Sequence, residues 1–219
     1  VNLGINSENI KVRKHDTNEL AHYAKATSDI EYKFPWGWDE LEGIANRRDF
    51  DLKSHAKYSG HELKYFDQEQ NTHYYPFVIE PSGGIDRSVL AFLLDSYKEE
   101  IVPTATKDKT DKRLVMKLDK SIAPIKVAIL PLSRNEQLAP IARQVYELTR
   151  GHGWLIEYDD TQSIGKRYRR QDEAGTPFCV TVDFDSIEDK KVTIRDRDSM
   201  HQERIDIDTL VQELIKRLE

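Results

Sequence analysis

The pattern of apolar and polar positions in roughly the first hundred residues predicts short strands and a few helices. Ile30, Tyr32 and Phe34 alternate with charged residues, as in a strand with one buried face. Further strands are predicted over 40–45 and 74–80, a helix over 49–58 and an amphipathic helix over 86–100. Hairpin-like strands closed by one long helix indicate an antiparallel sheet in an α+β domain.

The pattern changes beyond a Thr-, Lys- and Asp-rich stretch at 101–124, which we interpret as a connector with one short strand at 114–118. Strands are predicted over 125–132, 154–158 and 178–184, with helices over 136–150 and 163–171 between them. Strands over 191–195 and 204–207 and a helix over 209–218 complete the chain. Crossovers of this kind are right-handed and give a partly parallel sheet. The prediction is an α+β chain, with an antiparallel sheet domain over 1–121 and an α/β domain with a mixed sheet over 122–219.

Composition narrows the class of protein. The 219 residues suit one large domain or two small ones, and the net charge of −6 argues against nucleic-acid binding by bulk charge. The single cysteine, Cys179, excludes a disulfide framework and fits a reducing compartment. No apolar run approaches the roughly 20 residues of a membrane span. The chain begins with Val1 and not Met, which we interpret as a sign of a fragment.

The segment from Glu80 to Arg87 is the strongest candidate for chemistry. A predicted strand ends in a carboxylate, turns through Pro-Ser-Gly-Gly and opens a helix with Asp and Arg. Glycines let the backbone approach a ligand closely, and a helix start with an arginine suits an anion. These residues predict a cation site at Glu80 beside a phosphate site at Arg87. The alternative is that Glu80 caps a strand at the surface and Arg87 only faces solvent.

The Glu80–Arg87 segment resembles motif 3 of a class II aminoacyl-tRNA synthetase. The order of the segments before it resembles the dimeric glycyl-tRNA synthetase family. Those segments are Glu19–Ala24, Asp29–Tyr32, Gly37–Ala45, Arg48–Leu52 and His55. The segments Leu130–Leu132, Gly165–Arg169 and Gly175–Phe178 resemble the anticodon-binding domain that several class II enzymes share.

The resemblance implies an ATP-dependent glycine–tRNA ligase that forms glycyl-adenylate and transfers glycine to tRNA-Gly. Glu80 and Arg87 are the catalytic residues that it implies. The residues implied for glycine are Glu80, Pro81, Ser82, Gly83 and Gly84, and those for ATP are Glu40, Leu41, Gly84, Ile85, Asp86 and Arg87. Mg²⁺ would accompany ATP, and Glu40 would contact the adenine, the ribose or this ion. The alternative is that Glu40 is only an exposed strand carboxylate. We expect a cytoplasmic protein, homodimeric in its full-length form, with no membrane or DNA partner.

Basic residues of the second domain are candidates for tRNA phosphates, although a solvated helix face explains the first four equally well. They are Lys166, Arg167, Arg169, Arg170, Arg195 and Arg197. The histidines fit no zinc spacing, so we expect no protein metal site.

One departure from the family is large. Motif 1, which builds the dimer interface, and motif 2, which carries an ATP-contacting arginine, are not found in the sequence. We therefore expect the isolated chain to be inactive. Two other classes stay open: a non-catalytic binding protein descended from a synthetase, like the accessory subunit of mitochondrial DNA polymerase, and a stand-alone module that binds tRNA.

Overall fold

The computed structural model describes residues 2–103 and 110–219, which form two compact units. Unit 1 comprises residues 5–95, and unit 2 comprises residues 96–219 together with residues 2–4. Each unit is described by itself. No helix in the described residues combines the length and apolarity needed to cross a membrane.

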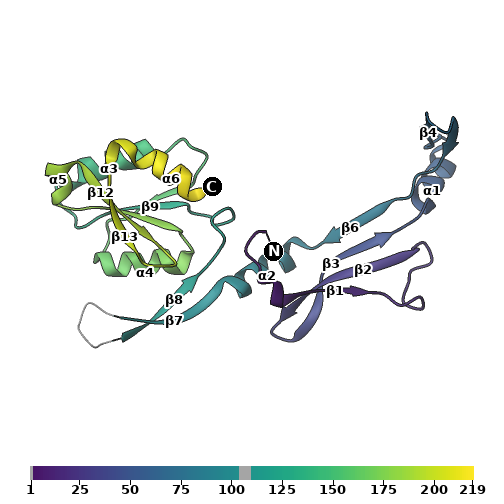
Figure 1. Ribbon diagram of the computed structural model, residues 1–219, viewed down its shortest axis with the longest axis horizontal. Helices are drawn as coiled ribbons and strands as arrows, with labels where there is room; N and C mark the ends of the chain where they lie inside the picture. The colour runs from purple at the N-terminus through teal and green to yellow at the C-terminus, as the bar shows by residue number, and fades with distance from the viewer. Residues whose placement is uncertain (1, 104–109) are drawn as a thin grey trace. The chain divides into compact units, whose positions relative to one another are not determined.

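Unit 1 is built on a four-stranded antiparallel sheet in the order β1-β2-β3-β6 (Figure 1). Its strands are β1 (Ile10–Lys14), β2 (Ala26–Phe34), β3 (Gly37–Asn46) and β6 (Ile79–Gly83). A small hairpin of β4 (Tyr65–Asp67) and β5 (Thr72–Tyr74) is separate from this sheet. The helical elements are η1 (Ser7–Asn9), α1 (Phe50–Ser59) and α2 (Ile85–Ser96).

The two faces of this sheet differ in polarity. Tyr32 and Phe34 of β2 are buried and form a small core with Ile5 and with Ala91 of α2. The alternate residues of β2, Asp29 and Glu31, lie on the opposite face, because successive strand side chains point to opposite sides. The expectation of a strand with one buried apolar face is confirmed at β2.

A bulge in β3 resets this alternation. Ile30 is opposite Glu42 and Glu31 is opposite Glu40, so Leu41 has no opposite residue. Leu41 packs against the apolar core, and Glu40 is thereby placed on the polar face with Asp29 and Glu31. Bulges of this kind re-aim side chains beside functional sites.

Unit 2 contains a five-stranded mixed sheet in the order β10-β9-β11-β12-β13. Its strands β9 (Val127–Pro131), β10 (Ile156–Tyr158) and β11 (Phe178–Val182) are parallel, while β12 (Lys191–Asp196) and β13 (Gln202–Asp206) are antiparallel. Helices α3 (Leu138–Thr149) and α6 (Leu210–Leu218) contribute to the core on one face, and α4 (Ile164–Ala174) packs on the other (Figure 1). The short elements α5 (Asp185–Asp189) and η2 (Ile207–Thr209) complete it. The predicted α+β class, with an antiparallel sheet and a mixed sheet, is confirmed.

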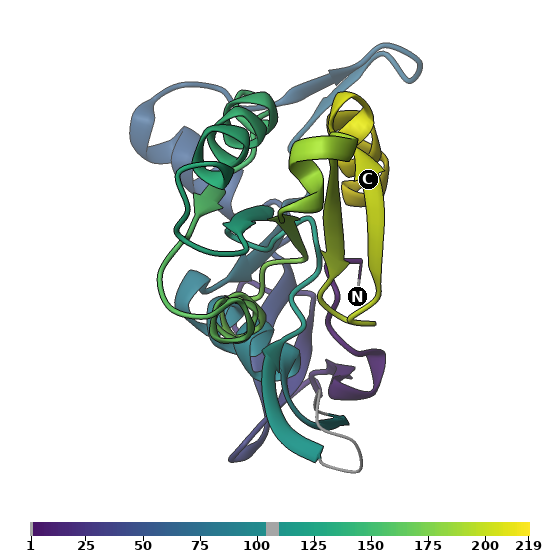
Figure 2. The same ribbon diagram turned by 90° about the vertical axis from the view of Figure 1, so that its left-hand side faces the viewer.

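A hairpin of β7 (Tyr97–Pro103) and β8 (Thr110–Met116) also belongs to unit 2 and runs beside α4 (Figure 2). The prediction of a connector over 101–124 is wrong for residues 101–103 and 110–116, which are strands, whereas 117–124 is irregular as predicted and 104–109 lie outside the described residues. The predicted strand at 114–118 overlaps β8. The predicted helix ends at Ser96 and not near 100. Pairing with β8 explains the difference, because it buries Val102 and Val115. The two compact units divide at 95/96, before the predicted domain boundary at 121/122. That domain boundary stays a prediction.

The strand predicted over 74–80 is displaced. Tyr74 ends β5, while β6 begins at Ile79 and continues through Pro81 and Ser82 to Gly83. Proline is tolerated there because β6 is an edge strand. The strand β1 and the β4–β5 hairpin had no clear signal in the sequence, since their side chains are mostly exposed or half-exposed.

Candidate functional site

The polar face of the unit 1 sheet carries the candidate side chains in rows across the strands. One row runs from Asp29 through Gly43 to Ser82, and the adjacent row runs from Thr27 through Ala45 to Glu80. The two middle residues are the smallest, so they form a low floor between carboxylates. The structure therefore places Glu80 and Ser82 on the same face of β6.

Gly43 lies close beneath the side chains of Glu40 and Asp29. A Cβ at this position would lie 3.2 Å from Oε1 of Glu40 and 3.8 Å from Oδ1 of Asp29. Both carboxylates are thus turned over the floor of the same face. Glu40 is exposed, whereas the side chain of Asp29 is only 6% exposed. Leu41, the other predicted contact in this strand, packs on the opposite face.

Asp29 and Glu31 are held by basic side chains near the edge of the sheet. Nε2 of His15 lies 2.6 Å from Oδ2 of Asp29, and Arg13 approaches both carboxylates at 3.5 and 3.1 Å. Lys11 adds a contact of 2.8 Å to Glu31. Sequence reasoning weighed these acids without their partners, because β1 was not predicted.

Glu80 is partly exposed and has one partner among the described residues. Nη1 of Arg47 donates to Oε2 of Glu80 at 2.8 Å, while Nε and Nη2 of the same guanidinium donate to both oxygens of Asp51. The guanidinium carbon lies 4.1 Å from the centre of the Tyr23 ring. The hydrogen bonds to Asp51 and Glu80 raise the pKa of Arg47 above its usual value. Sequence reasoning missed Arg47.

Arg87 lies in the first turn of α2 and reaches back to β3. Its Nη1 donates to the backbone carbonyl of Glu40 and lies 3.4 Å from Oδ1 of Asp39. Hydrogen bonds from Trp36 and from the Glu40 backbone N–H, together with the charge of Arg87, hold the pKa of Asp39 below its usual range. The Arg87 side chain is still 43% exposed, so it presents a charged surface at the start of α2.

The turn between β6 and α2 is open to solvent. Pro81, Gly83, Gly84, Ile85 and Asp86 are all exposed. Neither glycine has a positive φ, and a Cβ at Gly84 would meet nothing closer than Arg87 Cβ at 3.8 Å. Within the described residues, neither strain nor crowding requires glycine here.

The six basic residues of unit 2 do not form one open surface. Arg167 is fully buried and donates to the carbonyls of Pro131, Leu132 and Asp159. Arg195 forms a two-pronged ion pair with Asp172, and Arg197 donates to the carbonyl of Gly175 and to Asp198.

These three arginines stabilise the unit, so their burial argues against direct contacts with tRNA. Lys166, Arg169 and Arg170 remain accessible.

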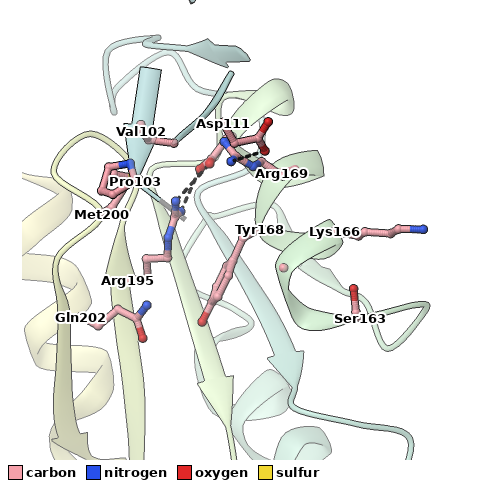
Figure 3. Close-up of a pocket in the computed structure, with 12 residues that line it drawn as sticks. Val102, Pro103, Asp111, Ser163, Lys166, Tyr168, Arg169, Arg195, Met200 and Gln202 are labelled. Atoms are coloured by element: carbon pink, nitrogen blue, oxygen red, sulfur yellow. Dashed lines mark hydrogen bonds and ion pairs between the residues drawn. The ribbon is translucent and has the colours of Figure 1, made fainter. Parts of the chain in front are cut away.

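A cavity of about 600 Å³ lies between α4, the β12–β13 turn and the β7–β8 hairpin. Figure 3 shows Tyr168 and Arg195 side by side in its wall, with Lys166 pointing away from both. The guanidinium carbon of Arg195 lies 4.8 Å from the centre of the Tyr168 ring. Oδ2 of Asp111 pairs with Arg169 at 3.1 Å. The cavity thus offers an aromatic ring and several polar groups.

Other candidate groups have structural environments. Cys179 is buried under α4, and burial raises the pKa of its thiol to about 12. No cluster of three or more histidine, cysteine or acidic side chains suited to a metal occurs in residues 2–103 and 110–219.

Comparison with solved structures places the fold among those of aminoacyl-tRNA synthetases. The structure of prolyl-tRNA synthetase from Cryptosporidium parvum with L-proline and AMP matches with a TM-score of 0.66 and 19% identity, covering 95% of this chain and 42% of that chain. The same enzyme with halofuginone and AMPPNP matches with a TM-score of 0.66 and 18% identity, over 95% and 40%. Residues 126–217 match the family model of the anticodon binding domain.

Relatives that match over nearly the whole chain include glycine–tRNA ligases. That of Thermobifida fusca is 56% identical over 221 residues, covering 100% of this chain and 47% of the relative. Those of Macrococcus caseolyticus and Streptomyces coelicolor are 57% and 52% identical, covering 94% and 99% of this chain and 43% and 47% of the relatives. The chain thus spans less than half the length of these three relatives.

Proposed function

We propose that the chain is the C-terminal part of a class II glycine–tRNA ligase of the dimeric type. The observation that carries this proposal is the placement of Glu80 and Ser82 over a floor of Gly43 and Ala45, next to Arg87 at a helix start. The identity of over 50% to glycine–tRNA ligases supports the same reaction. The full-length protein would activate glycine with ATP and transfer it to tRNA-Gly in the cytoplasm, as a homodimer.

Each side chain has a role that follows from its charge and place. Glu80 accepts hydrogen bonds from the ammonium group of glycine, and Ser82 offers a hydroxyl in the neighbouring row. The low floor leaves room for an amino acid without a side chain. With its ammonium fixed, the carboxylate of glycine is held for in-line attack on the α-phosphate of ATP.

The nucleotide would lie along the exposed turn from Gly84 to Arg87. Arg87 stabilises negative charge on the phosphates, and Gly84 allows the nucleotide to pass close to the backbone. Mg²⁺ would neutralise phosphate oxygens, and the donor set fits, because Glu40 supplies the hard oxygen ligand that this ion prefers. Leu41 would act from the core side, by fixing the position of Glu40.

Unit 2 would bind the anticodon arm of tRNA-Gly. Lys166, Arg169 and Arg170 are accessible for phosphates, whereas unstacked bases need aromatic and polar groups of the kind that Tyr168 provides.

A chimera tests the catalytic proposal. The 219 residues replace the segment that they match in the Thermobifida fusca glycine–tRNA ligase. We expect glycine-dependent ATP–pyrophosphate exchange and glycylation of tRNA-Gly by the chimera, and neither by the isolated chain. An Arg87→Ala chimera should lose roughly 100-fold or more in exchange, since it removes charge stabilisation in the reaction.

Different results would point elsewhere. A folded chimera without exchange activity would refute the proposal and favour a non-catalytic binding protein. Exchange by the isolated chain would refute its expected inactivity. In a gel-shift assay, the isolated chain could bind tRNA-Gly more tightly than unrelated RNA. Together with an inactive chimera, that result would favour a stand-alone tRNA-binding module.

A further inference from the structure

Several contacts hold Arg47 in place next to Glu80. It follows β3 directly, and its backbone N–H donates to the carbonyl of Val78 at 2.9 Å. The Arg48 carbonyl accepts from the Val78 N–H at 2.8 Å, so the backbone beyond β3 stays tied to the segment leading into β6. The side chain of Arg47 is only 19% exposed.

The guanidinium of Arg47 is divided between two carboxylates. One edge makes two hydrogen bonds to Asp51, of 2.7 and 2.9 Å, and Nη1 makes the third to Oε2 of Glu80. Its flat face lies on the ring of Tyr23. Planar, two-pronged pairing combined with stacking leaves an arginine few alternative conformations.

The charges of this group leave Glu80 attractive to a cation. Asp51 balances the charge of Arg47, so Asp51, Arg47 and Glu80 together carry one net negative charge. Only Oε2 of Glu80 is engaged among the described residues, which leaves Oε1 without a partner there. An unsupported carboxylate with 44% exposure would move among rotamers, and that freedom would be lost on binding an ammonium group.

We propose that Arg47, anchored by Asp51 and Tyr23, is a positioning residue that holds Oε2 of Glu80 so that Oε1 faces the ammonium group of the amino-acid substrate. This inference rests on the proposed function. It assigns Arg47 no contact with the substrate, so its effect passes through Glu80 alone. Arg87 and Glu40, which are proposed for the nucleotide, do not share this network.

Steady-state ATP–pyrophosphate exchange by the chimera tests the inference. We expect Arg47→Gln to raise KM for glycine about tenfold or more, while kcat changes less than about threefold and KM for ATP stays unchanged. Arg47→Lys should give an intermediate KM, because lysine keeps the charge but cannot reproduce the fork. Asp51→Asn should also raise KM for glycine, because Arg47 would then neutralise Glu80.

Arg204→Gln is the matched control. Arg204 also joins two carboxylates, Asp183 and Asp189, but it lies in unit 2. We expect this variant to lose a comparable ion-pair network without a change in KM for glycine. Circular dichroism and urea denaturation of every variant establish that each is folded at the assay temperature.

The outcomes separate the two proposals. An inactive parent chimera overturns the proposed function and this inference with it. An active parent whose Arg47→Gln variant keeps its KM for glycine overturns the inference alone. So does a variant in which KM for glycine and KM for ATP rise together with a loss of stability, because that result indicates a purely structural arginine.

Discussion

Asp172 is the centre of a buried ion network, and replacing it with asparagine should destabilise unit 2 strongly. Its side chain is 1% exposed and lies 2.8 Å from Nε of Arg113 and from Nη1 of Arg195, which are 0% and 6% exposed. A second bond of 3.0 Å joins its Oδ2 to Nη2 of Arg195. Glu100 contacts Arg113 from the other side at 2.9 Å.

The magnitude follows from this charge balance. Unit charges about 4 Å apart attract by about 4 kcal/mol at an effective dielectric constant of about 20. Asparagine keeps the shape of the side chain but leaves two buried arginines with only Glu100 to balance them. Removing one member of a buried ion pair costs about 3–5 kcal/mol, and we expect the Asp172→Asn variant to lose that much free energy of unfolding.

Urea denaturation followed by Trp154 fluorescence measures this loss. The chain has three tryptophans, so a Trp36→Phe, Trp38→Phe background leaves a reporter that packs on the core of unit 2. Asp206→Asn is the control, because Asp206 is 58% exposed and lies 3.7 Å from Lys191. It should change stability by less than about 1 kcal/mol. Equal, small losses in the two variants would refute the reasoning.

Two further changes test unit 2. Gly175→Ala should lower the free energy of unfolding by roughly 2–4 kcal/mol, because φ is +80° and a Cβ would lie 2.9 Å from Leu118 Cδ1. Gly153 is the control: its φ is +76° but the space around it is open, so Gly153→Ala should cost only about 1–2 kcal/mol in the same urea assay. Burial alone would raise the pKa of Asp183, but hydrogen bonds led by Arg204 outweigh it and hold that pKa below its usual range. The stability from this pair is therefore complete above the ordinary aspartate pKa of about 4 and is lost as pH falls through the lower folded value. As pH is lowered from 6 to 2, the urea midpoint of Arg204→Gln should fall less steeply than that of the parent protein. Parallel curves of midpoint against pH for the two proteins would contradict this assignment.

The buried strands of unit 2 were readable from the sequence because they are short apolar runs and two of them follow amphipathic helices. Val127–Pro131 is buried throughout, and the strands on either side of it follow amphipathic helices. The β7–β8 hairpin was not readable in the same way. Arg113 of β8 pairs with Asp172, which lies far away in the sequence, so no local pattern announces this contact.

In the candidate site, too, residues that share a local motif could be found from the sequence, whereas residues joined by long-range contacts could not. Glu80, Ser82 and Arg87 lie in one continuous segment, so motif and turn chemistry could find them together. Arg47 was missed because its contact with Glu80 joins residues that lie far apart in the sequence. Among the tRNA candidates, the sequence could not separate an exposed residue such as Lys166 from a buried one such as Arg167, because both stand in one run of basic letters.

The bulge at Leu41 has a consequence for how the length of this gene segment can vary. Leu41 is the one residue of the β2–β3 ladder without an opposite residue, so its deletion would keep every other pair in register. Loss of one residue from the paired stretch between Gly43 and Asn46 would instead shift the part of β3 that follows it by one position against β2 and β6, so its side chains would change faces. Among natural variants, deletion of the codon for position 41 is therefore compatible with an intact polar face. At the neighbouring paired positions we expect substitutions and no deletions.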